Sequence, residues 1–229
     1  MFLKNTIHEF IQILSNRLIN SQFDLHVQLR KKSTEETIDY IKKNMTNAII
    51  FLSRDKHLKH SLDQSDNSGL ILEFGVFQGK SISIIANHVS AEKIVYGFDS
   101  FEGLPSDWSG TEGYKKDFKT GIIPTVPKNV ILKKGLFEDT LPKFIKEKKD
   151  HVSFLHIDSD LYSSAKTILD NLSDRFVNGT IIVFDEYFNY PNWQNHEFKA
   201  FQEFILSTNL DYEYVSFTNS KSVTLKIKK

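Results

Sequence analysis

The chain has 229 residues and 40% hydrophobic content, which is enough for one large domain, and its 19 phenylalanines predict an aromatic-rich core. Lys and Arg together number 29, as do Asp and Glu, so no overall positive field would attract nucleic acid. Cysteine is absent, which excludes disulfides, thiolate metal ligands and cysteine nucleophiles.

Targeting and membrane signals are missing from the sequence pattern. The first residues, Met1–Glu9, lack the apolar segment of a signal peptide. No stretch approaches the ~20 apolar residues that a membrane-spanning helix needs. We therefore expect a cytoplasmic protein that has neither a membrane nor a nucleic acid as its partner.

The first 65 residues predict an N-terminal helical extension. Ser33-Thr-Glu-Glu36 has the form of a capping box, which predicts that a second helix begins there. A polar stretch over residues 63–69 separates the extension, residues 1–65, from residues 66–229. The extension is an ordinary packing layer, a dimerisation surface that would make the protein a homo-oligomer, or a cover over the active site. The apolar residues at helical spacing are Ile7, Phe10, Ile11, Leu14 and Leu18 in the first helix and Ile38, Ile41, Met45 and Ile49 in the second.

From Leu70 onward, apolar strands alternate with helices, which favours an α/β fold with a mostly parallel, doubly wound sheet. A helix is predicted over 163–176, with Asn178-Gly179 as its stop signal, and another over 196–207. The last two strands are joined by a short link and predict a C-terminal antiparallel hairpin. The seven predicted strands are 70–74, 94–98, 129–133, 152–157, 180–184, 212–217 and 222–228.

The segment Glu102–Asn129 lacks regular periodicity and contains four glycines and three prolines. A loop of this length inside a compact domain is usually functional or disordered. Trp108 and Tyr114 lie within it, and both rings would be unfavourable in water. We therefore predict that the loop covers the substrate as a lid, with a static surface excursion as the alternative.

A glycine-rich turn, Gly75-Val-Phe-Gln-Gly79, follows the first predicted strand of the sheet and precedes a helix. It has the form G-x-x-x-G rather than the G-x-G-x-x-G that binds a dinucleotide pyrophosphate. Asp99 ends the next strand, 24 residues after Gly75, close to the spacing at which such folds bind ribose hydroxyls. A ribose site without a pyrophosphate site indicates an adenosine-type ligand, and S-adenosylmethionine fits best.

Four acidic side chains follow two apolar runs that predict neighbouring strands. Asp158 and Asp160 come after one run, and Asp185 and Glu186 come after the next. Ligands of open α/β sheets bind at the carboxyl ends of strands that lie about 4.8 Å apart, so these carboxylates should converge. A divalent cation would relieve their repulsion, and oxygen ligands favour Mg²⁺, Ca²⁺ or Mn²⁺. The pattern predicts a metal-assisted enzyme rather than a passive binding module.

Five sequence blocks occur in order: Glu73-Phe-Gly-Val-Phe-Gln-Gly79, Gly97-Phe-Asp-Ser-Phe-Glu-Gly-Leu-Pro105, Gly135-Leu-Phe-Glu-Asp-Thr-Leu-Pro142, His156-Ile-Asp-Ser-Asp-Leu-Tyr162 and Phe184-Asp-Glu-Tyr187. Together they resemble the macrocin O-methyltransferase family. The resemblance implies a Rossmann-like, class I, S-adenosylmethionine-dependent methyltransferase domain over residues 66–229. Such enzymes methylate hydroxyls of sugars, typically with a divalent cation such as Mg²⁺, so the expected partner is a small-molecule sugar acceptor.

The resemblance also implies roles for the matched residues. Asp158, Asp185 and Glu186 would bind the metal, and Asp160 would be the catalytic base, with Asp158 beside it as a second catalytic residue. Better-known members have Asp-Asp where this chain has Asp-Glu, so Glu186 departs from the family pattern. The block 135–138 would flank the adenine. The implied cofactor-binding residues are Glu73, Phe74, Gly75, Gly79, Ser81, Asp99, Ser100, Phe101, Leu136, Phe137 and Asp158.

In the mechanism that we expect, the metal binds the acceptor hydroxyl while Asp160 takes its proton. A catechol-type acceptor is a close variant, because vicinal hydroxyls also chelate a metal.

The G-x-x-x-G turn and the lack of a Tyr-x-x-x-Lys pair disfavour a nicotinamide dinucleotide oxidoreductase. A cofactor-binding protein without catalysis is also disfavoured, because an idle carboxylate cluster would add only repulsion. His156 is interpreted as a core histidine rather than as a ligand.

Overall fold

The computed structural model describes residue 12, residues 22–111 and residues 117–228. The apolar stripe predicted between Ile7 and Leu18 lies outside the described residues, as does Tyr114. The helices are α2 (Leu25–Asn44), α3 (Arg54–Asp63), α4 (Lys80–His88), α5 (Phe137–Glu147), α6 (Tyr162–Leu172) and α7 (Glu197–Thr208), with 3₁₀ turns η1 (Ser173–Arg175) and η2 (Trp193–Asn195). The strands are β1 (Ile49–Phe51), β2 (Leu70–Phe74), β3 (Val95–Asp99), β4 (Val130–Lys134), β5 (Val152–Ile157), β6 (Phe176–Phe184), β7 (Asp211–Thr218) and β8 (Val223–Lys228).

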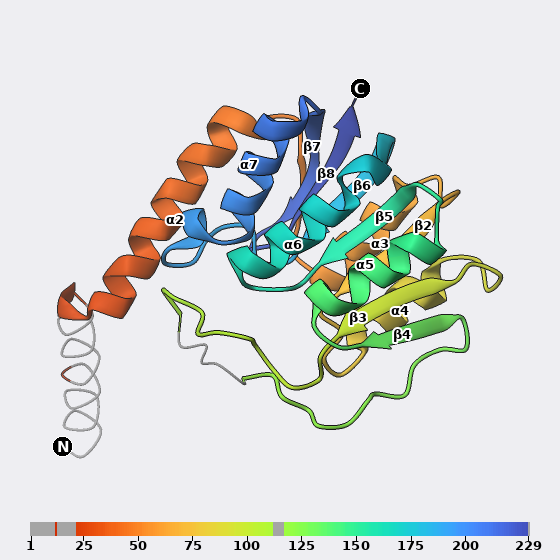
Figure 1. Ribbon diagram of the computed structural model, residues 1–229. Helices are drawn as coiled ribbons and strands as arrows, with labels where there is room; N and C mark the ends of the chain where they lie inside the picture. Colours follow the sequence, from red (N-terminus) through yellow and green to blue (C-terminus); the bar gives the residue numbers. More distant parts are fainter. Residues whose placement is uncertain (1–11, 13–21, 112–116, 229) are drawn as a thin grey trace, which may run out of the picture.

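The strands of the described chain form one eight-stranded sheet in the order β1-β7-β8-β6-β5-β2-β3-β4. Neighbours are parallel except that β8 runs antiparallel to both β6 and β7. Helices α5, α6 and α7 cover one face of the sheet, and α3 and α4 cover the other (Figure 1). The predicted α/β, Rossmann-like fold with a mostly parallel sheet and a C-terminal antiparallel hairpin is confirmed.

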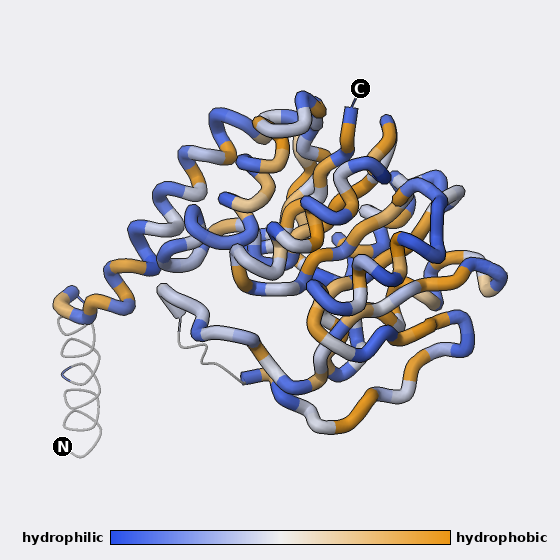
Figure 2. Tube along the Cα trace, in the orientation of Figure 1, coloured by the Kyte–Doolittle hydropathy of each residue, from blue (hydrophilic) through white to orange (hydrophobic). Residues whose placement is uncertain are grey.

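The central strands β2 and β5 position the site. Every residue in these two strands is buried, as expected for strands covered by helices on both faces. Figure 2 shows hydrophobic residues concentrated in the strands and hydrophilic residues along much of α2. Phe74 pairs with Ile157, and Ile157 pairs with Phe184, so β2, β5 and β6 end side by side. The residues that follow these strands therefore meet at one edge of the sheet.

The capping-box prediction is wrong, because α2 begins earlier. The carboxylate of Asp24 accepts hydrogen bonds from the backbone N–H groups of His26 and Val27 and so caps the helix. Ser33 lies inside α2, where its hydroxyl donates to the carbonyl oxygen of Leu29. The helix therefore continues through the predicted start signal without interruption.

The second apolar stripe of the N-terminal segment also ends earlier than predicted. Ile49 belongs to β1, which pairs in parallel with β7 at the edge of the sheet. Two adjacent isoleucines followed by a phenylalanine favour a strand, because β-branched and aromatic side chains fit a pleated surface. This short strand is added to the seven predicted ones.

Asn178-Gly179 is not the helix stop that the sequence predicts. Both residues lie inside β6, and α6 ends at Leu172. The pairing of β5 with β6 shifts register after Val152, and Gly179 has a φ of +96°. Glycine adopts this conformation without strain, so the Asn-Gly pair marks an irregularity in the strand.

The described part of the N-terminal segment packs onto the rest of the chain. The hydroxyl of Tyr40 lies 2.7 Å from that of Tyr214, and Glu36 accepts a hydrogen bond of 2.8 Å from Gln194 in η2. Helix α3 contacts β6 and β7. The domain boundary near residue 65 stays a prediction, and both β1 and α3, which precede it, belong to the layers of the sheet.

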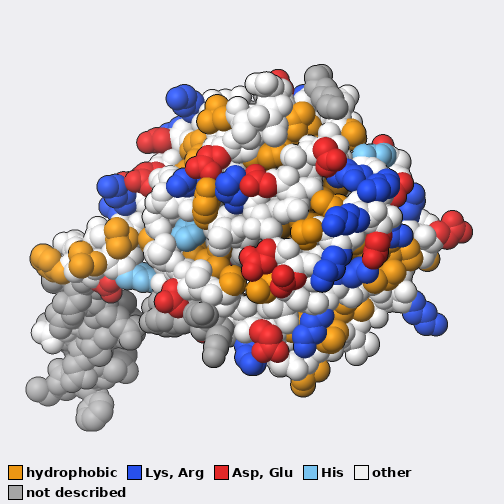
Figure 3. Space-filling model, viewed as in Figure 1, with side chains coloured by type: hydrophobic (Ala, Val, Ile, Leu, Met, Phe, Trp, Pro, Cys, Tyr) orange, Lys and Arg blue, Asp and Glu red, His pale blue; other side chains and the backbone are white. Residues whose placement is uncertain are grey.

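The N-terminal end of α2 exposes apolar side chains. Phe23 is 79% exposed and Leu25 is 77% exposed, and Figure 3 shows hydrophobic side chains gathered at this end of the helix. Assembly of copies of the chain through the N-terminal helices stays a prediction.

Elsewhere on the face that Figure 3 shows, acidic and basic side chains are interspersed. Among the helices described, none has the length and apolar character needed to span a membrane.

Candidate active site

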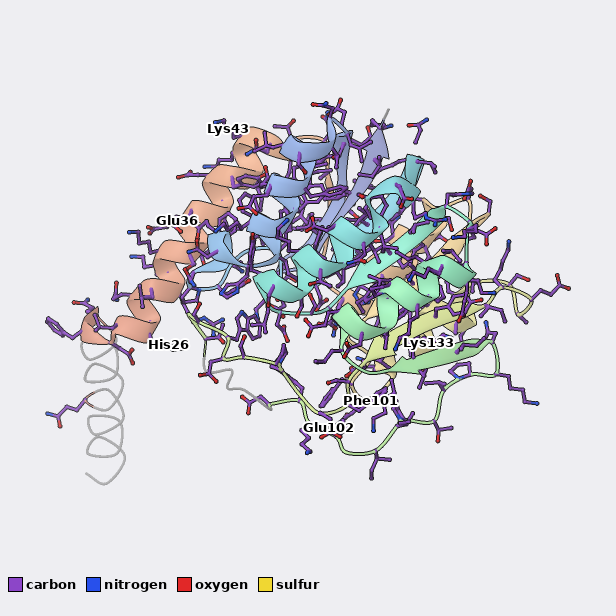
Figure 4. All side chains as sticks on the ribbon, viewed as in Figure 1. His26, Glu36, Lys43, Phe101, Glu102 and Lys133 are labelled. Carbon is purple, nitrogen blue, oxygen red and sulfur yellow. The ribbon has the colours of Figure 1, made fainter. Side chains whose placement is uncertain are left out.

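A cavity of about 460 Å³ lies at the carboxyl ends of β2, β3, β5 and β6. The long loop after β3, which begins at Phe101 and Glu102 (Figure 4), forms one wall. The sequence-predicted residues that line the cavity are Gly75, Asp99, Ser100, Leu136, Phe137, Asp158, Asp160, Asp185 and Glu186. The cavity thus brings the predicted cofactor turn and the predicted catalytic carboxylates together.

Gly75 is required both by its backbone conformation and by its surroundings. Its φ is +92°, a region that L side chains rarely adopt, and a Cβ there would collide with the carbonyl oxygen of Asp158. The backbone N–H of Asp158 donates to the carbonyl of Phe74 at 2.8 Å. The glycine turn after β2 therefore packs directly against the acidic loop after β5.

Asp99 organises the same turn. Its Oδ2 accepts hydrogen bonds from the backbone N–H groups of Val76 and Phe77 at 2.8 and 2.7 Å. Its Oδ1 accepts one from Phe101 at 2.7 Å. One carboxylate thus fixes both the glycine turn and the start of the long loop. A carboxylate has about four acceptor positions, so Asp99 retains capacity for a ribose hydroxyl.

Five residues predicted to bind the cofactor lie behind the cavity wall. Glu73 and Phe74 are fully buried, and Phe101 is 1% exposed. Ser81 donates a hydrogen bond of 3.1 Å to Glu73, and Gly79 caps the start of α4 with a φ of +81°. Within the described part of the chain, these five shape the turn and the helix without lining the cavity. Their direct contact with a cofactor stays a prediction.

Asp158 and Asp185 are joined by Arg54, the first residue of α3. The Nε of Arg54 donates to Oδ1 of Asp185 and its Nη2 donates to Oδ2 of Asp158, both at 2.6 Å. Burial and the charge of Asp185 raise the pKa of Asp158 to about 7, against the opposing effect of Arg54. Burial alone would lower the pKa of Arg54, but the two carboxylate charges outweigh it and raise that pKa. The chain itself therefore supplies a cation to this carboxylate pair.

His156 links the carboxylate pair to Glu73. Its Nδ1 lies 3.0 Å from Oε2 of Glu73, and both side chains are buried. Burial alone would lower the pKa of His156, but the Glu73 hydrogen bond and the charges of Glu73, Asp158 and Asp185 raise it. One ligand atom each from His156, Asp158 and Asp185 lies within 4.8 Å of the other two. The two carboxylates fit a divalent cation such as Mg²⁺ or Mn²⁺, whereas a protonated His156 would add a positive charge rather than a ligand.

Asp160 lies in the cavity in a left-handed backbone conformation, with a φ of +62°. It is 9% exposed, and burial together with the charges of Asp158, Glu186 and Glu197 raises its pKa well above the usual range. Among the described residues, no hydrogen bond reaches the Asp160 carboxylate, although its backbone N–H is bonded. The neighbouring negative charges favour the protonated form of Asp160, and a cation bound at Asp158 and Asp185 would favour the ionised form that can accept a proton.

Glu197, the first residue of α7, holds the two acidic loops together. Its carboxylate is completely buried. Its Oε1 accepts hydrogen bonds from the backbone N–H groups of Ser159 and Asp160 at 3.0 and 3.1 Å and from the Ser159 hydroxyl at 3.2 Å. Its Oε2 accepts one from the backbone N–H of Glu186 at 3.3 Å. One side chain thus connects the residues after β5 with those after β6.

Glu186 is paired with Lys221 in the turn between β7 and β8. Its Oε2 lies 2.7 Å from the Nζ of Lys221. Burial raises the pKa of Glu186 to about 7, against the opposing effect of Lys221. The Lys221 ammonium also lies 5.5 Å from the ring centre of Trp108 and 5.4 Å from that of Tyr190. Metal ligation by Glu186 stays a prediction, since its carboxylate contacts Lys221 instead of joining Asp158 and Asp185.

The first part of the long loop is anchored beside the cavity. Trp108 packs edge-on against Tyr190, with ring centres 5.5 Å apart. The carbonyl oxygen of Ser109 accepts a hydrogen bond of 2.9 Å from Nε2 of His196, and its hydroxyl accepts one of 2.8 Å from Asn192. Figure 1 shows the loop extending towards α2 before it returns to β4. The loop lines the cavity, and its function as a lid stays a prediction.

Sequence reasoning missed three residues that shape the site: Arg54, Glu197 and Lys221. They come from α3, α7 and the β7–β8 turn, far along the chain from the acids that they contact. For Glu197 a weak signal was present, because an acidic residue at the start of a helix is favoured by the helix dipole. Arg54 and Lys221 lie in segments whose pattern predicts only a helix and a turn.

Comparison with known proteins assigns the chain to a family. The model of a family described as "Methyltransferase domain" matches residues 72–187, about half of the chain. The chain is 24% identical to the 8-demethyl-8-(2,3-dimethoxy-alpha-L-rhamnosyl)-tetracenomycin-C 4'-O-methyltransferase of Streptomyces olivaceus, over 52% of this chain and 53% of that protein. The chain therefore spans about half the length of the curated relative that it matches.

Two solved structures have a similar fold. The calicheamicin methyltransferase CalS11 superposes with a TM-score of 0.63 at 20% identity, covering 92% of each chain. An apo structure of CalS11, described as a TDP-rhamnose 3'-O-methyltransferase, gives a TM-score of 0.56 at 19% identity and covers 87% of this chain and 93% of that one. At these identities the likeness shows the fold. The family match identifies the chain as a member of the methyltransferase domain family, and its fold is the one found in CalS11.

Proposed function

We propose that the protein transfers a methyl group from S-adenosylmethionine to a hydroxyl of a sugar or a nucleotide-linked sugar, with help from a divalent cation. The observation that carries the proposal is the single cavity shared by the glycine turn at Gly75, the ribose-site acid Asp99 and the carboxylates of Asp158, Asp160 and Asp185. The names of two relatives, which refer to a rhamnosyl group and to TDP-rhamnose, support a sugar acceptor.

The cofactor would extend from the glycine turn towards Asp99. The methionine end would lie beside Gly75, which lines the cavity and whose lack of a Cβ lets the turn pack against the acidic loop. Asp99 would accept hydrogen bonds from the ribose hydroxyls, and Leu136 and Phe137 at the start of α5 would lie against the adenine. The sulfonium methyl would then face the carboxylates after β5 and β6.

The transfer itself needs an oxygen nucleophile in line with the sulfonium and a group that accepts the hydroxyl proton. The bond from the methyl carbon to sulfur breaks with its electron pair remaining on sulfur, while a bond from oxygen to that carbon forms. The hydroxyl proton moves to the free carboxylate of Asp160, and neutral S-adenosylhomocysteine leaves. A positioned base of this kind typically contributes about 10²–10⁴-fold to the rate.

A divalent cation held by Asp158 and Asp185, with His156 or Glu186 as further ligands, would lower the pKa of a coordinated hydroxyl. The donor set supports this, since one ligand atom each from His156, Asp158 and Asp185 lies within 4.8 Å of the others. Glu186 and Lys221 form the wall next to Asp160, where the acceptor would bind beside the ring of Trp108. An aromatic ring and a charged pair at this wall suit a sugar, which presents both an apolar face and hydroxyls.

The proposal is tested with methyl-labelled S-adenosylmethionine, Mg²⁺ and two sets of acceptors, nucleotide-linked deoxysugars and catechols. We expect label to enter a nucleotide-linked sugar and to disappear in an Asp160→Asn variant that still binds S-adenosylhomocysteine. Transfer to catechols alone would replace the sugar proposal with the catechol variant. If neither set accepts the methyl group while S-adenosylhomocysteine binds tightly, the proposed acceptor class is wrong and the cofactor assignment stands.

A further inference from the structure

Arg54 bridges the two carboxylates that would bind a divalent cation in the proposed function. Its guanidinium contacts Asp158 and Asp185 through two different nitrogen atoms, each at 2.6 Å. These are two of the three residues whose ligand atoms converge within 4.8 Å. The two carboxylate oxygens that Arg54 occupies are therefore withdrawn from any other ligand as long as these hydrogen bonds persist.

The Arg54 guanidinium and a metal ion would compete for the carboxylates of Asp158 and Asp185, because both are positively charged. A guanidinium keeps its positive charge across the physiological pH range. A divalent ion between Asp158 and Asp185 would lie within a few ångströms of that charge, and like charges this close repel strongly where water is partly excluded. The side chain of Asp185 is only 10% exposed and that of Asp158 is 25% exposed, so screening by solvent is limited.

The Arg54 side chain can leave without moving the fold. It is 47% exposed, and it extends from the first residue of α3, so its long stem can turn towards solvent. The start of α3 is fixed independently by the hydroxyl of Ser53, which accepts a hydrogen bond from the backbone N–H of Lys56. Release of the guanidinium therefore changes a rotamer and leaves the helix in place.

We propose that Arg54 is the internal counter-ion of Asp158 and Asp185 in the metal-free protein, and that a divalent cation binding these carboxylates displaces it. This inference rests on the metal-assisted function proposed above. Arg54 then sets the affinity for the metal, because each binding event must break two charge-assisted hydrogen bonds. It also offsets part of the negative charge of the carboxylate pair between metal-binding events.

The test uses Mn²⁺ as the probe, with free Mn²⁺ followed by electron paramagnetic resonance. Three full-length proteins are compared: wild type, Arg54→Gln and Lys56→Gln. Lys56 is exposed on the same helix, so its variant loses the same charge without touching the carboxylates. We expect Arg54→Gln to bind Mn²⁺ more tightly than wild type by on the order of tenfold or more, and Lys56→Gln to match wild type.

A second measurement covers the case in which Arg54→Gln folds poorly. The chain has four arginines, Arg17, Arg30, Arg54 and Arg175, so the Arg54 Nε–H signal can be assigned by nitrogen-15 NMR in the wild-type protein. Addition of Mg²⁺ should shift this signal to the position of a solvated guanidinium. An Arg54 signal that does not move while Mg²⁺ is bound would overturn the inference.

The outcomes separate this inference from the proposed function. If wild type binds Mn²⁺ and Arg54→Gln binds it equally or more weakly, the displacement is wrong and the metal site stands. If neither protein binds Mn²⁺, the proposal that a divalent cation assists the methyl transfer is wrong, and the inference about Arg54 is wrong as well. An Asp158→Asn variant that still binds Mn²⁺ with wild-type affinity would show that the ion lies elsewhere and would also overturn the inference.

Discussion

Glu197 accepts a hydrogen bond of 3.1 Å from the backbone N–H of Asp160, so a fully buried carboxylate holds the proposed catalytic base in place. The same oxygen also accepts from the backbone and hydroxyl of Ser159. These bonds fix Asp160 in a left-handed conformation that a non-glycine residue rarely adopts. We infer that Glu197 is a positioning residue for the reaction.

Replacement of Glu197 by Ala should lower kcat more than it lowers cofactor affinity. It leaves buried N–H groups of the acidic loops without an acceptor, at about 1–3 kcal/mol each, and the loop that carries Asp160 should relax. Glu197→Gln keeps a carbonyl oxygen where Oε1 lies and should recover most of the activity. Steady-state kinetics and S-adenosylhomocysteine calorimetry measure the two effects.

The control for this experiment is Glu203→Gln on the same helix, where a partly exposed carboxylate accepts a hydrogen bond from Tyr162. It should leave kcat unchanged. If Glu197→Ala keeps full kcat, or loses cofactor affinity in proportion to kcat, Glu197 has no specific positioning role.

Asp160→Asn should lower kcat by roughly 10²–10⁴-fold, because an amide cannot take the acceptor proton. S-adenosylhomocysteine should bind as in wild type, since Asp160 is not part of the cofactor turn. Asp170→Asn, which removes an exposed carboxylate paired with Lys166 on α6, is the matched control. A residual rate close to wild type in Asp160→Asn would assign the base to another residue.

Gly75→Ala should destabilise the fold and abolish cofactor binding. The added Cβ meets the backbone carbonyl of Asp158, and the positive φ adds about 1–2 kcal/mol of strain. Gly121→Ala separates the two effects, because Gly121 has a φ of +65° but a Cβ added there would meet no atom within 4 Å. In urea unfolding, Gly75→Ala should lose clearly more free energy than Gly121→Ala. Equal losses would show that the turn can move away from the acidic loop.

His57 should make stability depend on pH. Burial lowers its pKa to about 4 from 6.5, and its ring nitrogens contact the hydroxyls of Thr224 and Ser222 at 2.9 and 3.2 Å. As pH falls, the unfolded chain takes up the proton first, so the stabilisation is complete above about pH 6.5 and is lost towards pH 4. The loss is about 3 kcal/mol, from about 1.4 kcal/mol per pKa unit.

Urea unfolding of wild type and His57→Gln between pH 7 and pH 4 checks this. The free energy of unfolding should fall more steeply with decreasing pH in wild type than in the variant. Parallel curves would mean that His57 is already protonated, or equally accessible to protons, in the folded chain.

The sheet could be predicted from the sequence because its strands are local. The apolar runs at 70–74 and 152–157 coincide with β2 and β5, since a strand buried on both faces has a continuous hydrophobic pattern. Where the sequence pattern was short or fitted two kinds of structure, the predicted element was wrong. The three residues of β1 continue an apolar helical stripe, and Asn178-Gly179 has the same form at a helix end and at a strand irregularity.

Only the site residues that come directly after strands could be predicted from the sequence. Asp158 and Asp185 come directly after β5 and β6, so parallel topology alone brings them together. Arg54 reaches them across 104 and 131 residues of sequence, and no local pattern encodes such a contact. The same holds for Glu197. Both residues act through side-chain geometry that exists only once α3 and α7 have packed against the sheet.

The most direct test is the methyl-transfer rate of wild type after EDTA treatment, before and after Mg²⁺ is restored, with the sugar acceptor identified as above. In the proposed mechanism a metal held by Asp158 and Asp185 activates the acceptor, so the stripped protein should bind cofactor but turn over slowly, and Mg²⁺ should restore the rate. A stripped enzyme that retains its full rate would contradict the metal-assisted mechanism.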